Sequence, residues 1–115
     1  YNLESDKGRR IKFICLKHKI RIKVITPEQY LEPIGYLAGL PEIQSCKEIY
    51  QDQGFEDEML VFKGFDSNTL NLFLKEFSKN KIERVALKAV LTPDNIKWNS
   101  VQLYEEIKKE HEALH

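Results

Sequence analysis

Two lysines interrupt apolar stretches in the second half of the chain, and both are candidates for binding an anion. Lys88 shares one face of a predicted strand with apolar neighbours, and Lys63 has a comparable place in the preceding predicted strand, on the face of Met59 and Val61. If the two ammonium groups met on one sheet face, with Thr92 and Asn95 nearby, they could bind a carboxylate or a phosphate. The alternative is that each lysine lays its aliphatic stem along the sheet and keeps its charge in water, or lies under a second subunit.

The turn after this strand also has a structural explanation. Asn99 and Gln102 have the spacing of a capping box, in which each side chain accepts a hydrogen bond from the other's backbone N–H. Trp98, the only tryptophan, and Leu103 have the spacing of a hydrophobic staple across the same helix start. Each cap is worth about 1 kcal/mol. We therefore predict that these four residues are structural anchors of the final helix.

The segment 111–115 matches the H-E-x-x-H motif of zinc proteases. Histidines four residues apart share a helix face, so His111 and His115 could bind zinc with Glu112 as general base. A catalytic zinc site needs a third protein ligand, which such enzymes supply downstream, and here the sequence ends at His115. A five-letter pattern with two free positions also arises by chance. We interpret the match as accidental, and we expect no metal and no cofactor.

The overall charge balance argues against a nucleic-acid or membrane partner. Lys and Arg number 18, as do Asp and Glu, so the formal net charge at pH 7 is zero. The eight cations from Lys7 to Lys23 form a local basic run, which we interpret as the solvated side of a helix and a strand. No apolar run reaches the roughly 20 residues of a membrane helix. The aromatic pattern with which RRM domains contact RNA is missing.

The cysteines favour a reducing compartment. Cys15 and Cys46 lie in unrelated contexts without metal-binding spacing. With no recognisable secretory signal, this favours a cytoplasmic protein. Neither cysteine has the histidine and asparagine partners that would indicate nucleophilic catalysis, and no glycine motif for phosphate binding is present. The chain begins at Tyr1 rather than Met, which leaves open whether native residues precede it.

Hydrophobic spacing predicts the elements that position these residues. Helices are predicted at 6–18, 66–80 and 100–114, and strands at 20–25, 59–65 and 85–91. Residues 1–3 suit the end of a further strand, which we expect to be longer in the native protein. Residues 28–40 suit short helical turns. Residues 41–57 form a long polar connection, which we expect to be mobile.

The order of these elements predicts a ferredoxin-like α+β fold, in the pattern βαββαβ. We therefore expect one domain over residues 1–115, with a four-stranded antiparallel sheet. Two right-handed crossovers would place both main helices on one sheet face. The additional C-terminal helix would cover an edge or part of the other face.

The sequence resembles a bacterial family of small domains of unknown function, number 3783. The resemblance spans most of the chain and is most specific in its second half. It is carried by residues 34–39 (IGYLAG), 55–62 (FEDEMLVF), 86–92 (ALKAVLT), Asn95, Trp98 and 103–106 (LYEE). It implies a small ferredoxin-like fold and no established activity. It also places Lys88, Thr92, Asn95 and Trp98 within the family's motif, which raises the interest of these residues for function.

These observations favour a non-enzymatic cytoplasmic module for binding, regulation or protein interaction. We expect an open sheet face or the segment 88–98 to contact a protein partner, a second copy of the chain or a small anion. The alternative is a small anion-handling enzyme, similar to the acylphosphatases, with Lys88 and Lys63 as anion contacts. The sequence identifies neither the ligand nor the oligomeric state.

Overall fold

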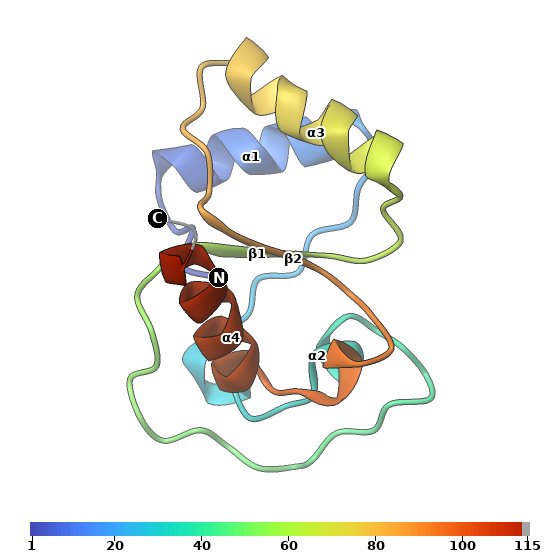
Figure 1. The fold of residues 1–115 in the computed structure, drawn as a ribbon, viewed down its shortest axis with the longest axis vertical. Helices are drawn as coiled ribbons and strands as arrows, with labels where there is room; N and C mark the ends of the chain where they lie inside the picture. The colour runs from blue at the N-terminus through green and yellow to red at the C-terminus, as the bar shows by residue number, and fades with distance from the viewer. Residues whose placement is uncertain (114–115) are drawn as a thin grey trace.

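The fold has three layers arranged around two short parallel strands (Figure 1). The computed structural model describes residues 1–113. Strand β1 (Met59–Phe62) pairs in parallel with β2 (Leu87–Val90), so that Met59 lies opposite Leu87 and Phe62 opposite Val90. Helices cover both faces of this pair, and we call the two helical layers upper and lower, as they stand in Figure 1.

The helices divide between these layers. The upper layer contains α1 (Asp6–Lys17) and α3 (Ser67–Lys79), and the lower layer contains α2 (Ile34–Leu37) and α4 (Ser100–Ala113). Two 3-10 turns, at Pro27–Gln29 and Asn95–Lys97, complete the regular elements of the described chain.

Each layer has its own apolar core. The upper core joins α1 and α3 to the strands through Ile11, Ile14, Phe62, Phe73 and Phe77. The lower core joins α2 and α4 to the strands through Ile34, Met59, Leu87 and Leu103. Successive residues of a strand point to opposite faces, so each strand contributes to both cores.

The predicted ferredoxin-like fold with four antiparallel strands is wrong. Within residues 1–113 the sheet has two strands, and they are parallel. Residues 20–25 are extended, but no backbone hydrogen bond joins 21–25 to another segment of the described chain. Their alternation of apolar and basic side chains meets the local requirement for a strand, whereas pairing also requires a neighbour whose N–H and C=O groups are free. Of the predicted first strand, Tyr1 alone bonds to β1, exchanging backbone hydrogen bonds of 2.9 and 3.2 Å with Met59.

Helix α3 shows how local chemistry sets the limits of an element. The Asp66 carboxylate caps its N-terminus by accepting a hydrogen bond of 2.7 Å from the Thr69 N–H. At its C-terminus the left-handed residue is Lys81, with φ of 55°, one position after Asn80. The Ile82 N–H then bonds to a carbonyl of the last helical turn at 2.8 Å. This arrangement satisfies a carbonyl that the helix leaves without a partner and turns the chain toward β2.

The connection 41–57 is attached to the lower layer near both of its ends. The Phe55 ring stacks on the buried Tyr30, with ring centroids 4.7 Å apart. Near the other end, the Ser45 hydroxyl donates a hydrogen bond of 2.6 Å to the carboxylate of Glu32, which is itself buried. The mobility of the residues between these contacts stays a prediction.

Gly8 in α1 should not tolerate a side chain. In a helix interior alanine is usually more stable than glycine by about 1 kcal/mol. Here, however, a Cβ on residue 8 would lie 1.6 Å from the backbone oxygen of Leu3. We expect the clash to dominate and Gly8→Ala to lower the free energy of unfolding by about 1–3 kcal/mol. Urea unfolding followed by circular dichroism measures this change. Lys12→Ala, at an exposed position of the same helix, is the control, and a Gly8→Ala protein as stable as the wild type would contradict the packing.

Candidate anion-binding site

The structure does not bring Lys63 and Lys88 together. Lys88 lies opposite Leu60, which packs against the upper core, so Lys88 belongs to the upper face of the sheet. Lys63 is exposed and donates a hydrogen bond of 3.2 Å to the carbonyl of Ala38, which follows α2 in the lower layer. The two ammonium groups therefore lie in different layers, on opposite faces of the sheet. An anion site that requires both of them is not formed.

Thr92 and Asn95 shape the turn after β2. The Thr92 N–H donates to the Asn95 Oδ1 at 2.9 Å, and the Asn95 N–H donates to the Thr92 Oγ1 at 3.1 Å. The Asn95 amide also donates to the carbonyl of Val90 at 3.0 Å. Asn95 is 8% exposed, and both polar atoms of its side chain are engaged within the turn. Thr92 and Asn95 therefore stabilise the turn.

The four anchor residues lie at the start of α4. Asn99 and Gln102 exchange hydrogen bonds of 2.9 Å from backbone N–H to side-chain oxygen, which is the geometry of a capping box. Trp98 packs against the lower core, which contains Leu103. The Trp98 carbonyl also accepts a hydrogen bond of 2.7 Å from the N–H of Ile34. This corner thus joins α4 to α2.

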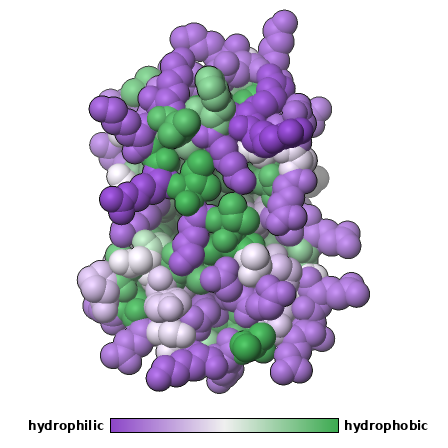
Figure 2. All heavy atoms as spheres, turned by 180° about the vertical axis from the view of Figure 1, so that it is seen from behind, coloured by the Kyte–Doolittle hydropathy of each residue, from purple (hydrophilic) through white to green (hydrophobic). Residues whose placement is uncertain are grey.

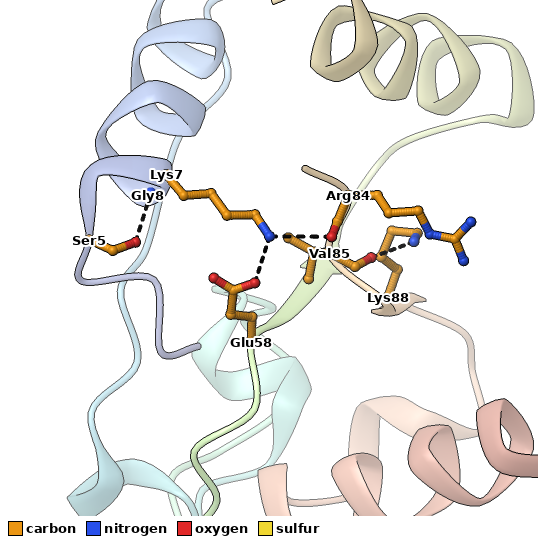
Figure 3. A network of polar contacts seen from close by, with 7 residues as sticks. All are labelled: Ser5, Lys7, Gly8, Glu58, Arg84, Val85 and Lys88. Atoms are coloured by element: carbon orange, nitrogen blue, oxygen red, sulfur yellow. Dashed lines mark hydrogen bonds and ion pairs between the residues drawn. The ribbon is translucent and has the colours of Figure 1, made fainter. Parts of the chain in front are cut away.

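Lys88 lies near Arg84, and Lys7 reaches the same segment of the chain from its other side, so we call the group of Lys7, Arg84 and Lys88 the basic edge (Figure 3). The Lys7 ammonium donates to the Glu58 carboxylate at 2.7 Å and to the Arg84 carbonyl at 3.2 Å. The Lys88 ammonium donates to the carbonyl of Val85 at 2.5 Å. Side chains from α1 and β2 therefore bind consecutive carbonyls of the segment that leads into β2.

The basic edge carries more positive than negative charge. Its one carboxylate, Glu58, pairs with Lys7, whereas Arg84 and Lys88 have no acidic partner within the described chain. In Figure 3 the Arg84 side chain extends away from Lys7, and the Lys88 ammonium lies beside it, turned toward the Val85 carbonyl. Burial, and secondly the charge of Arg84, lower the pKa of Lys88. Because nothing nearby neutralises them, a bound anion would stabilise both cations.

One part of the basic edge is local in sequence and was missed. Arg84 lies four residues before Lys88 and is therefore close to it in sequence. Strand alternation does not extend to Arg84, because Val85 packs in the upper core whereas Leu87 packs in the lower core. Lys7 could not be found by proximity in sequence, because it is 51 residues distant from Glu58 and 77 from Arg84 in sequence.

The H-E-x-x-H match falls partly outside the described residues, since His115 is not among them. Within residues 1–113 no group of three His, Cys, Asp or Glu side chains is arranged to hold a metal ion. The same range contains no helix that combines the length and the apolar character needed to cross a membrane. Both cysteines are free thiols, with Cys15 buried and Cys46 exposed.

Comparison with known proteins assigns a family to the second half of the chain. Residues 58–114 match the family model described as "Domain of unknown function (DUF3783)". The matched segment includes β1, α3, β2 and the described part of α4, and with them Glu58, Arg84 and Lys88 of the candidate site. No curated protein and no solved structure matches the chain.

Replacing Asn95 tests whether the turn is structural. Asn95→Ala removes two side-chain hydrogen bonds and leaves the Thr92 N–H and the Val90 carbonyl without them. We expect it to lower the free energy of unfolding by about 2–3 kcal/mol, as measured by urea denaturation. Asn71→Ala, at an exposed position in α3, should change stability by less than about 0.5 kcal/mol. A stable Asn95→Ala protein would show that the turn does not depend on this side chain.

Proposed function

Because the chain belongs to this family, whose description names no activity, we propose its function from the geometry of the site: a non-enzymatic cytoplasmic module that binds an anionic group at the basic edge. The observation that carries the proposal is the pair of Arg84 and Lys88, neighbouring cations without a carboxylate partner in the described chain. A carboxylate or phosphate group of a partner would supply the missing charge.

The surroundings of Lys88 support this role. Strand β2, which is paired with β1, supplies the lysine. Arg84 lies three residues before this strand, and its carbonyl accepts a hydrogen bond of 3.2 Å from Lys7. The Val85 side chain between them is 1% exposed and fixes the local backbone in the upper core. Binding at such a site requires little ordering of the protein, which reduces the entropic cost of association.

The cytoplasmic location is part of the proposal. Two free thiols suit a reducing compartment, and an exposed one such as Cys46 would be oxidised readily outside it. The acylphosphatase-like alternative relied on Lys63 and Lys88 acting on one anion, and the separation of these two residues removes that arrangement.

Charge removal at the basic edge should weaken anion binding. We expect inorganic phosphate, titrated at low ionic strength, to perturb the backbone amide NMR signals of residues 84–88. Lys88→Ala and Arg84→Ala should each weaken the fitted affinity about tenfold, because each removes one charge-assisted hydrogen bond. Lys97→Ala removes an exposed lysine elsewhere and should leave the affinity unchanged. Equal affinity in all three variants would refute the site.

The lowered pKa of Lys88 gives the binding a pH signature. A lysine binds an anion only when protonated, so affinity should fall as the pH rises through its pKa, and here this occurs at a lower pH than for an ordinary lysine. Lys88→Arg keeps its charge throughout this range. The variant should therefore retain phosphate binding at alkaline pH where the wild type has lost it. Identical pH profiles for the two proteins would show that Lys88 is not the titrating contact.

A further inference from the structure

Helix α1 has apolar side chains on two opposite faces. The inner face is buried in the upper core and consists of Gly8, Ile11, Ile14 and Cys15. On the opposite side Phe13 is 70% exposed and Leu16 is 76% exposed, although both are large and apolar. They are three residues apart, so they are neighbours on the helix surface. The structure therefore leaves an apolar pair in solvent on the outer face of α1.

Cations surround this pair. Residues 7–25 contain eight of the 18 Lys and Arg residues and no Asp or Glu, which leaves the rest of the chain with ten against all 18 acidic residues. Arg9 and Lys12 lie on the same stripe of α1 as Phe13 and Leu16, and Lys17 follows beside Leu16. The molecule extends 40 Å along its longest axis. Arg9 pairs with Asp6 at 3.2 Å, whereas Lys12 and Lys17 have no acidic partner within the described chain. At physiological salt a charge is screened beyond about 8 Å, so distant acidic residues do not cancel the field of these two lysines.

The mixture of apolar and basic side chains continues beyond the helix. Residues 18–26 pass behind the strands in Figure 1, and Figure 2, which shows the molecule from that side, has apolar side chains gathered along the middle of the face. Within this segment Ile22 is 46% exposed and Val24 is 45% exposed, and Arg21 and Lys23 alternate with them. A shallow hollow of about 420 Å³ adjoins Phe13, with Arg9 and Arg10 in its lining.

We propose that the outer face of α1 docks on an anionic lipid surface. Phe13 and Leu16 would enter the boundary between headgroups and acyl chains, and Lys12 and Lys17 would contact lipid phosphates. Apolar residues at the centre of a cationic helix face are the pattern of interfacial membrane binding, and basic segments are attracted by the surface potential of anionic lipids. This docking site is separate from the basic edge and does not rest on the proposed function.

Two other anionic partners fit this face less well. Protein interfaces are depleted in lysine, whereas five of the eight cations in 7–25 are lysines. Proteins that bind single-stranded nucleic acid stack bases on aromatic rings, and the exposed apolar side chains here are aliphatic except for Phe13. Helices that bind at a lipid interface carry both aliphatic and aromatic side chains on their apolar face. The earlier expectation of no membrane partner relied on the zero net charge of the whole chain, which this face does not share.

Sedimentation with vesicles tests the proposal. The full chain is mixed with vesicles of phosphatidylcholine alone, or with one third phosphatidylglycerol. We expect it to sediment only with the anionic vesicles, and binding to weaken as salt rises. The double variant Phe13→Ala, Leu16→Ala should reduce the partition coefficient roughly tenfold or more, because it removes the apolar contact. The matched control is Leu72→Ala, which truncates a 61% exposed leucine on α3 and should bind like the wild type.

Three results would overturn the proposal. These are equal binding to neutral and anionic vesicles, no binding to either, and unchanged binding of the double variant. A single-stranded oligonucleotide that binds wild type and double variant equally, while the vesicles bind neither, would assign the cationic face to nucleic acid. If the double variant is less stable by circular dichroism, Lys12→Glu with Lys17→Glu replaces it, and anionic binding that survives this charge reversal refutes the docking face. Lys88→Ala should bind vesicles like the wild type, which keeps this test independent of the basic edge.

Discussion

The parallel pairing of β1 with β2 is the constraint on which the rest of the structure depends. Parallel strands cannot be joined by a tight turn, so the chain between them must cross over the sheet, and α3 is that crossover. A sheet of two strands is also marginal by itself. Its apolar residues point to both faces, and each face therefore has to be covered by helices. The upper and lower layers follow from this requirement.

The local elements were predictable from the sequence, and their assembly was not. The helices at 67–79 and 100–113 and the strands at 59–62 and 87–90 all fall within the ranges that hydrophobic spacing predicts. The segment 20–25 has an equally good alternating pattern and does not pair. The alternation of apolar and polar residues is a local property of the sequence. Strand pairing depends instead on which distant segment has free backbone N–H and C=O groups. The expected open sheet face is not present, because helical layers cover both faces of the strand pair. Apolar residues on both faces of the last strand are typical of parallel strands buried between two layers.

The candidate site likewise combines local features that the sequence predicts with contacts that depend on the fold. The corner from Thr92 to Gln102 depends on side chains within five residues of one another, and its caps follow from spacing alone. The basic edge combines a local pair, Arg84 and Lys88, with Lys7 from a different helix. The local pair is four residues apart in sequence, but strand periodicity does not predict it, because Val85 and Leu87 pack in opposite cores. The approach of Lys7 depends on how α1 lies across the segment before β2, and only the fold supplies that information.

The layered arrangement also determines where the cations of residues 7–25 lie on the molecule. The cations of residues 7–25 would average out in a chain that wound back and forth between layers. Here α1 lies wholly in the upper layer, so Lys12 and Lys17 lie on the same helix surface as Phe13 and Leu16. The inner face of the same helix is committed to the upper core by Ile11 and Ile14. Its outer face has no such task, and Phe13 and Leu16 remain exposed there. Because truncating exposed side chains seldom costs the fold much, the reason for two large apolar residues among cations has to be sought in what this face contacts.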